Sequence, residues 1–309
     1  MDKLHVLKNY RNFKCKCDKC RHTCCAYWRI NVSKSDYDRI TALDNSLNHL
    51  VKEEYPTSKR YAHIKLDNKG LCPALDKGMC SLQIKYGVNA LTTICMEYPR
   101  LVRYVNQPEI ALSTSCEAVV ESLFGNDLIE FENIDKSYMF NNTYSKNQHF
   151  IKHNKVRNKM FDYLYKDPNI KGINNIKDYL NGDINTEWNK SIYMFIKNIY
   201  NEFFRYRATI TSYPHFMDNV SFDNIKIEDN HMIINLLINH MYYMNFPYCN
   251  NNENIVDNFI GLYIVYRLMQ ITFSILSDDI LIDEIAFLFR EIEHSRYYDL
   301  IGNLYRELI

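Results

Sequence analysis

Five cysteines lie close together near the start of this sequence. They fall within eleven residues, among basic and polar side chains, at Cys15, Cys17, Cys20, Cys24 and Cys25. Lysine, arginine, aspartate and histidine separate the thiols, so the segment cannot form an apolar face of a core strand or helix. Clustered thiols in a reducing compartment are typical of metal sites or reactive centres rather than disulfides. The pattern therefore predicts metal ligation.

Four more cysteines extend the predicted ligand set: Cys72, Cys80, Cys95 and Cys116. Thiolates bind both zinc and iron–sulfur clusters, and the spacing does not choose between them. Residues 1–65 hold 14 Lys and Arg against 7 Asp and Glu, an excess that would offset a negatively charged site. The vicinal Cys24 and Cys25 project in different directions, which suits two metal atoms, or one ligand and one structural thiol. The tenth cysteine, Cys249, is expected to be a loop thiol without function.

Composition narrows the class of protein. The 309 residues carry 37 Lys+Arg and 37 Asp+Glu, which argues against nucleic-acid binding by overall charge. With 47% hydrophobic residues and only 8 Gly and 7 Pro, the chain predicts a folded core that is not loop-rich all-β. No signal peptide is recognisable, and the most apolar stretch, 259–276, contains Arg267 and Gln270. We therefore expect a cytoplasmic protein with no membrane partner, and a buried helix at 259–276.

The part of the sequence that carries the cysteines is predicted to form short elements between turns, whereas the later part is predicted to form long helices. Nine of the ten cysteines precede residue 117, between turns predicted at 67–70 and 76–78 and helices at 35–50 and 115–125. Later segments have helical periodicity, at 148–165, 187–210, 225–244, 255–275, 280–292 and 297–308. The predicted fold class is mainly α, with an irregular cysteine-rich metal-binding N-terminal domain (1–130) and an α-helical C-terminal domain (131–309). The helix at 255–275, apolar on most faces, is expected to be central.

Several motifs together resemble the flagellin lysine-N-methylase family, which is related to a group of small proteins with a cysteine-rich CxxCxxCC metal-binding signature. In order, the N-terminal motifs are Phe13-x-Cys15, Cys20-x3-Cys24-Cys25-x2-Trp28-x-Ile30, Cys72-Pro73-x-Leu75, Gly78-x-Cys80-Ser81-Leu82, Cys95-x2-Tyr98-Pro99-Arg100 and Leu112-Ser113-x-Ser115-Cys116-Glu117-Ala118. The C-terminal ones are Ile234-Asn235-Leu236-Leu237 to Phe246-Pro247 and Arg290-Glu291-Ile292-Glu293-His294-Ser295. The resemblance therefore spans nearly the whole chain.

The sequence also departs from the family pattern. Ala26 and Glu117 stand where the family commonly has Gly and Pro. Cys17 is an additional thiol that creates a Cys17-x2-Cys20 spacing, closer to that of the wider cysteine-rich group. The first metal ligand is therefore either Cys15 or Cys17.

The resemblance implies methyl transfer from S-adenosylmethionine to the side-chain nitrogen of flagellin lysines, with an iron–sulfur cluster required. A four-iron cluster is expected, with zinc as the alternative. Because no Gly-rich loop follows a strand, a Rossmann-type methyltransferase fold is not supported. The remaining alternative is a non-catalytic zinc- or cluster-binding protein whose helical domain is a partner-binding surface.

Methylation requires a neutral lysine, which calls for a carboxylate or an imidazole near the nucleophile. The candidate catalytic residues are Glu117, Glu293 and His294, although the last two could instead form a helix cap or an inter-helix hydrogen bond. The candidate cofactor contacts are Tyr98, Arg100 and Trp28. Trp28 would cover the metal site, while Arg100 either pairs with a cluster sulfide or a substrate carboxylate or only helps to turn the chain.

Overall fold

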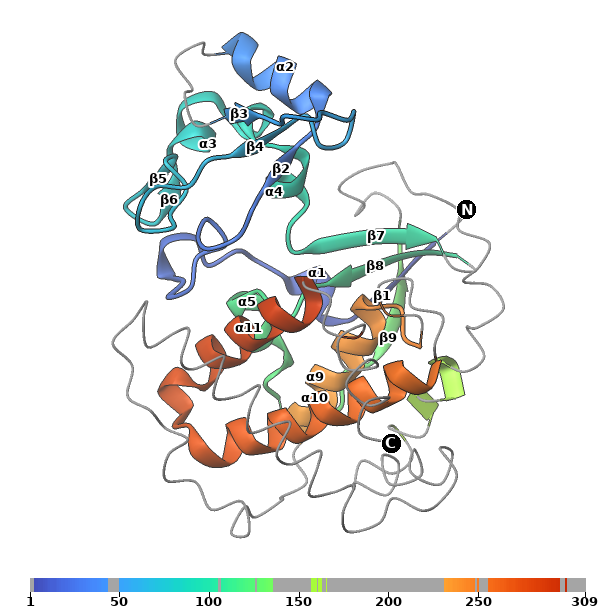
Figure 1. The fold of residues 1–309 in the computed structure, drawn as a ribbon. Coiled ribbons are helices and arrows are strands. Elements are labelled where there is room, and N and C mark those ends of the chain that lie inside the picture. The colour runs from blue at the N-terminus through green and yellow to red at the C-terminus, as the bar shows by residue number, and fades with distance from the viewer. Residues whose placement is uncertain are drawn as a thin grey trace. The chain divides into compact units, whose positions relative to one another are not determined.

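The fold comes from a computed structural model (Figure 1). It describes residues 3–43, 50–104, 107–125, 127–135, 157–159, 161–162, 165, 231–247, 249, 255–294 and 298. The predicted helix at 187–210 lies outside the described residues, as do most of those at 148–165 and 297–308.

The chain groups into two compact units. The described residues of the first, called the cysteine unit, lie within Lys14–Leu101. Those of the second, called the helical unit, lie within Met1–Phe13, Val102–Tyr138 and Thr143–Ile309. The cysteine unit is thus inserted into the chain of the helical unit. The predicted boundary between residues 130 and 131 stays a prediction, but the grouping puts residues 102–138 with the helices.

A three-stranded antiparallel sheet carries the core of the cysteine unit. In sheet order, its strands are β2 (Asn31–Val32), β4 (Ala62–Ile64) and β3 (Leu50–Lys52). The buried cluster on this sheet consists of Ile30, Val32, Ala62 and Ile64. Cys72 and Cys95 are partly buried and pack against this cluster, so the apolar core anchors two of the nine predicted ligands.

Short helices and one hairpin complete the cysteine unit. They are η1 (Cys17–Lys19), α2 (Lys34–Leu43), β5 (Leu75–Asp76), β6 (Met79–Cys80), α3 (Ser81–Tyr86), η2 (Val88–Ala90) and α4 (Thr93–Glu97). Asp36 of α2 accepts hydrogen bonds from the backbone N–H and the hydroxyl of Thr93, both at 3.0 Å. Burial raises the pKa of Asp36, but these bonds and one from Arg39 outweigh it and lower the pKa. The charged Asp36 therefore fixes the start of α4, which carries Cys95.

Two glycines allow the cysteine-bearing loops to approach each other closely. Gly70 and Gly78 have positive φ angles of 76° and 80°. A Cβ atom on Gly78 would lie 2.7 Å from the Cα of Asp18, and one on Gly70 would lie 2.7 Å from the ring of Tyr27. The loop that holds Cys17 and Cys20 therefore packs directly against the turn before Cys80.

A four-stranded sheet forms one layer of the helical unit. In sheet order, its strands are β7 (Arg100–Tyr104), β8 (Pro108–Leu112), β1 (Leu4–Leu7) and β9 (Phe131–Ile134). β1 pairs in parallel with β8, with Val6 opposite Ile110, and antiparallel with β9, with Leu4 opposite Ile134. The N-terminal strand therefore lies inside the sheet rather than at its edge.

Helices accompany this sheet, and two of them pack against its strand β8. The helices are α1 (Asn9–Asn12), α5 (Glu117–Leu123), α9 (His231–Tyr243), α10 (Ile255–Ile275) and α11 (Asp278–His294). The two that contact β8 are α1 and α9, while α5 packs against α9 and α11, and α10 packs against α9 and α11. α10 buries residues on several faces, among them Phe259, Ile264 and Leu268, as expected for a central helix.

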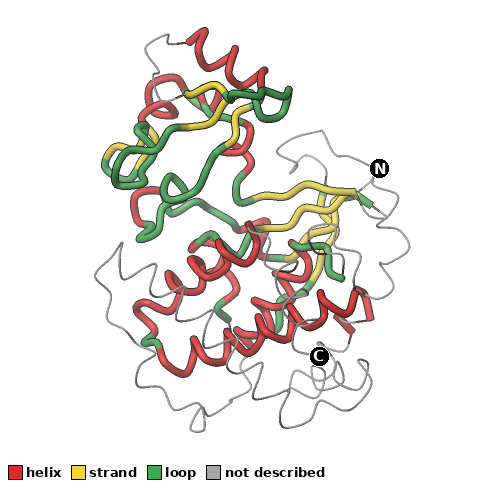
Figure 2. Tube along the Cα trace, viewed as in Figure 1, coloured by secondary structure: helices red, strands yellow, loops and turns green. Residues whose placement is uncertain are grey.

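The prediction of a mainly α fold is wrong, because the described chain is a mixture of helices and strands (Figure 2). Strands occupy the N-terminal part, which was expected to be irregular, and they are short, with two to five residues each. Such short segments carry too little alternation to be recognised in a sequence. The helical second half is confirmed as far as it is described, since no described residue after Ile134 lies in a strand.

The predicted helices agree closely with the described ones. The prediction of 255–275 matches α10, and the prediction of 280–292 lies within α11. The helix expected at 35–50 is shorter, since α2 ends at Leu43 and Leu50 begins strand β3. None of the described helices combines the length and the apolar character needed to cross a membrane.

Candidate functional site

A turn of serines and threonine connects β8 to α5 in the helical unit. Ser113, Thr114 and Ser115 have no exposed surface, and Cys116 and Glu117 follow them at the start of α5. Buried hydroxyl groups must form hydrogen bonds to offset the loss of water. Their partners come from α9 and α11, so the turn is the place where three elements bring polar side chains together.

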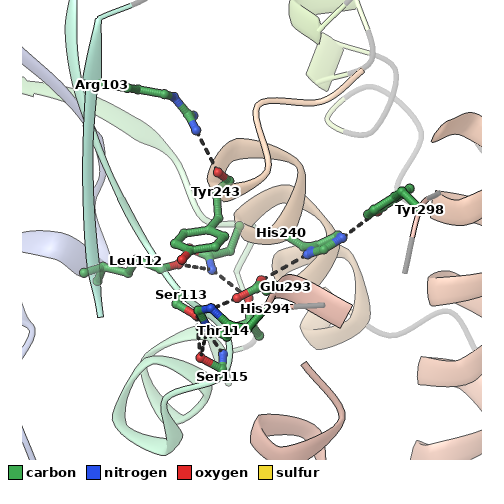
Figure 3. A network of polar contacts seen from close by, with 11 residues as sticks. Arg103, Leu112, Ser113, Thr114, Ser115, His240, Tyr243, Glu293, His294 and Tyr298 are labelled. Atoms are coloured by element: carbon green, nitrogen blue, oxygen red, sulfur yellow. Dashed lines mark hydrogen bonds and ion pairs between the residues drawn. The ribbon is translucent and has the colours of Figure 1, made fainter. Parts of the chain in front are cut away.

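The last turn of α11 supplies two predicted catalytic residues to this site (Figure 3). The Ser113 hydroxyl donates to Oε2 of Glu293 at 2.6 Å. The Nε2 atom of His294 lies 2.9 Å from the Ser115 hydroxyl and 3.2 Å from that of Ser113. The predicted pair Glu293–His294 therefore sits on the serine turn of β8–α5, about 180 residues away in sequence.

Helix α9 supplies the third side of the site. Nδ1 of His240 lies 3.0 Å from Oε1 of Glu293, and neither side chain has exposed surface. One residue earlier, the Asn239 amide donates to the Leu112 carbonyl at 2.8 Å and to the Thr114 hydroxyl at 2.9 Å. Consecutive polar residues of one helix thus fix both the turn and the carboxylate.

The buried end of the site lies beyond His240. Nε2 of His240 is 2.6 Å from the Tyr298 hydroxyl, which also hydrogen-bonds the thiol of Cys249. The Tyr298 ring packs closely on α10, because a Cβ atom on Gly261 would lie 2.5 Å from it. Cys249, which was expected to be a loop thiol, is fully buried, and its burial raises the pKa of the thiol.

His294 is the accessible member of the site. The residue is partly exposed to solvent, and its ring contacts Tyr243 edge-on at 6.2 Å between ring centroids. Burial of the ring lowers the pKa of His294, and Arg290 lowers it further, which together outweigh the opposite effect of Glu293. The imidazole is therefore neutral at pH 7 and can accept a proton.

A buried ion-pair cluster in the same unit holds the end of α9. Both carboxylate oxygens of Glu109 are engaged, by Arg157 at 2.6 Å and 3.0 Å and by Arg103 at 2.9 Å. Arg103 also donates to the backbone carbonyls of Tyr242 and Tyr243, the last two residues of α9. The Tyr243 hydroxyl in turn hydrogen-bonds Ser113. This cluster therefore supports the serine turn from the side of the sheet.

The predicted metal ligands divide between the two units. Cys116 belongs to the helical unit, and the other eight belong to the cysteine unit. Cys15, Cys17 and Cys24 are exposed, and the rest of the set is partly buried. The backbone N–H of Cys17 points at Sγ of Cys15, 3.4 Å away, so the two alternative first ligands lie side by side.

Four thiols of the cysteine unit lie within electrostatic range of one another: Cys25, Cys72, Cys80 and Cys95. Burial raises the pKa of Cys72 to about 12 and that of Cys95 to about 11, and the neighbouring thiols add to both shifts. The donor chemistry suits zinc or an iron–sulfur cluster. However, no three His, Cys, Asp or Glu side chains in the described part of the chain are grouped so that they could hold one metal ion. Their positions therefore do not form a ready ligand shell.

The predicted cofactor contacts lie together in the cysteine unit. The rings of Trp28 and Tyr98 meet edge-on, with 5.0 Å between centroids. The indole N–H of Trp28 donates to the carbonyl of Cys24 at 2.5 Å, which places the ring beside the cysteine segment. Arg100 is partly exposed at the start of β7. Their role toward a cofactor stays a prediction.

The sequence predicts Glu293 and His294 of α11 as site residues, but it does not predict their partners. His240, Ser113 and Ser115 were not predicted to be functional. A signal was available, since Asn239 and His240 interrupt a helix that is otherwise almost entirely apolar, and a buried polar residue needs a partner. The third candidate, Glu117, is buried at the first residue of α5, directly after the serine turn.

The fold and the site define a mixed α/β protein with a network of hydrogen-bonded hydroxyl, imidazole and carboxylate groups. Two curated relatives, both named Lysine-N-methylase, match part of the chain. The one from Salmonella choleraesuis (strain SC-B67) is 26% identical over 123 residues, which are 37% of this chain and 31% of the relative. The one from Salmonella typhimurium (strain LT2) is 26% identical over 122 residues, 37% of this chain and 30% of the relative.

The chain is distantly related to the lysine-N-methylases, which confirms the resemblance recognised in the sequence. The matched region spans about a third of the length of these relatives. No family model matches the chain, and no solved structure matches it significantly.

Proposed function

We propose that this protein is a protein-lysine N-methyltransferase that uses S-adenosylmethionine as the methyl donor. The observation that carries the proposal is the partly exposed, neutral imidazole of His294, held by the buried serine turn beside Glu293. The name of the distant relatives agrees with it.

The proposed reaction needs a base because a lysine amine is protonated at neutral pH, with an ordinary pKa near 10.4. His294 accepts one proton from the ammonium group, and the neutral amine then attacks the methyl carbon. S-adenosylmethionine supplies an electrophilic methyl group on a sulfonium, so that one N–C bond forms as one S–C bond breaks. Glu293 accepts from the Ser113 hydroxyl, which also contacts His294, and its negative charge favours a positive charge on the imidazole.

Flagellin is the proposed substrate. The test is to incubate the full-length protein, purified without oxygen, with flagellin and methyl-labelled S-adenosylmethionine. We expect label on lysine side chains of flagellin, and none on flagellin whose lysines have been acetylated beforehand. Absence of label on flagellin and on other lysine-rich proteins would favour the alternative, a non-catalytic metal-binding protein whose helices bind a partner.

An iron–sulfur cluster in the cysteine unit is a separate part of the proposal. The chemistry of the donor set supports it, because four partly buried thiols influence one another's pKa and four more cysteines lie in the same unit. No step of the proposed reaction uses the iron–sulfur cluster.

Anaerobically purified protein should be brown and should contain acid-labile sulfide. Replacement of Cys95 by Ser should remove most of the metal and loosen the cysteine unit, since metal binding and folding are linked in such sites. Cys249→Ser is the matched control, because Cys249 is buried in the helical unit, and it should leave the metal content unchanged. A colourless protein with stoichiometric zinc would contradict the cluster.

A further inference from the structure

The polar groups of the candidate site form one continuous chain of hydrogen bonds. The chain runs through His294, Ser115, Ser113, Glu293, His240, Tyr298 and Cys249. Four successive links measure 2.9, 2.5, 2.6 and 3.0 Å. These four donor–acceptor distances are short enough for direct proton transfer between neighbours.

The direction of the donors follows from the chemistry of Glu293. A carboxylate only accepts, so Ser113 donates its hydrogen to Oε2 and Nδ1 of His240 donates to Oε1. Ser115 then donates to Ser113, and Nε2–H of His294 donates to Ser115. This arrangement leaves the lone pair of His294 on Nδ1, which is the nitrogen able to act as a base.

Burial separates the two ends of the chain. His294 is exposed, whereas Ser113, Ser115 and the side chains of His240 and Glu293 have no exposed surface. Inward of His294, a transferred proton therefore moves through hydroxyl groups that have no exposed surface.

We propose that Ser115 and Ser113 relay the proton of the substrate amine from His294 to Glu293, and that His240 is a positioning residue that orients the Glu293 carboxylate. The proposal rests on the methyltransferase function proposed above. Nδ1 of His294 takes the amine proton while its Nε2 proton passes to Ser115. The hydrogen of Ser115 moves to Ser113, and that of Ser113 moves to Glu293. One amine loses a positive charge, one carboxylate loses a negative charge, and the imidazole ends neutral.

Among the described residues, the charged and titratable groups around the relay come from α11, α9 and α5. At the start of α5, Cys116 and the buried Glu117 directly follow Ser115. His294 faces Glu293 and Arg290 from its own helix and the Tyr243 ring from α9. Glu293 faces His240 and Tyr243 from α9. The pH dependence of the reaction should therefore report on the relay itself and on the substrate amine.

The test compares the rate of methyl transfer by the full-length wild type and by Ser115→Ala between pH 7.0 and 9.5. Because it lacks the relay hydroxyl, Ser115→Ala should transfer methyl groups at least about tenfold more slowly than the wild type at pH 7.0. The deficit should shrink as the pH rises, because a growing fraction of lysine is already neutral and needs no base. A deficit that is equal at every pH would show a merely structural role and overturn the relay, as would wild-type activity at pH 7.0.

Two substitutions of His240 test the positioning role independently. Asn carries an amide nitrogen near the place of Nδ1 and can still donate to Glu293, whereas Gln places its amide near Nε2 and can only reach Tyr298. We expect His240→Asn to keep the wild-type pH profile and His240→Gln to reproduce that of Ser115→Ala. Identical profiles for both variants would overturn the role of His240. If the wild type itself transfers no methyl group at any pH, the function proposed above fails, which is a different result from failure of the relay.

Discussion

Replacement of His294 by Gln is expected to lower the rate of methyl transfer at pH 7 by about 100-fold or more, the usual contribution of a general base. Gln keeps a polar group near Ser115 but cannot accept the lysine proton. The wild-type rate should fall on acidification below about pH 6.5, because the pKa of His294 lies below its usual value and the imidazole must be neutral to act. The measurement is the initial rate with labelled methyl donor across that pH range.

His5→Gln is the matched control for this experiment. His5 belongs to the same unit, and burial likewise lowers its pKa, but it hydrogen-bonds Asn133 at the edge of the sheet. Its replacement should leave the acidic limb of the profile in place. If His294→Gln retained activity within about threefold of the wild type, His294 would not be the base and Glu117 would become the leading candidate.

Replacement of Glu109 by Ala should lower the free energy of unfolding by about 3–5 kcal/mol, the range found when one partner of a buried ion pair is removed. The two guanidinium groups of Arg103 and Arg157 would remain buried without their carboxylate. Because Arg103 also holds the end of α9, the site should loosen too. Denaturant unfolding monitored by circular dichroism measures the change.

The pH dependence of stability gives a second readout of Glu109. Burial raises its pKa, but the charges of Arg103 and Arg157 outweigh burial and hold the pKa below its usual value. The stabilisation is therefore fully present above about pH 4.5 and is lost as the pH falls through the lower folded pKa. Glu109→Ala should flatten this acid limb. Glu53→Ala is the control, since Glu53 also lies between two basic groups, Arg29 and His63, but at the surface, where little change is expected.

The helices could be read from the sequence because their apolar periodicity is long and uninterrupted. The 21 residues of α10 provide nearly six turns of pattern, and both ends were predicted correctly. Strands β1 and β8 have four and five residues, and β8 is buried at every position, including Glu109. A buried carboxylate in a short apolar run gives no alternation, so the sheet could not be predicted.

Only part of the site could be predicted, because only some of its residues lie in a recognisable sequence motif. Glu293 and His294 lie in a recognisable motif. The role of His240 can be seen only from the contact between α9 and α11. Such contacts depend on tertiary packing, which one sequence does not specify. The nine predicted metal ligands illustrate the opposite case, in which spacing suggests chemistry but the described positions do not converge on a metal.

The place of β1 within the sheet has a consequence for the order in which the chain can fold during synthesis. Its partners, β8 and β9, begin at Pro108 and Phe131, so β1 leaves the ribosome about one hundred residues before its neighbours emerge. The inserted cysteine unit, whose described residues end at Leu101, is available to fold in the meantime. Closure of this sheet is thus a late, non-local event, which favours slow folding. A bulky fusion placed directly before β1 would hinder the pairing of β1 with β8 and β9, which completes the sheet of the helical unit.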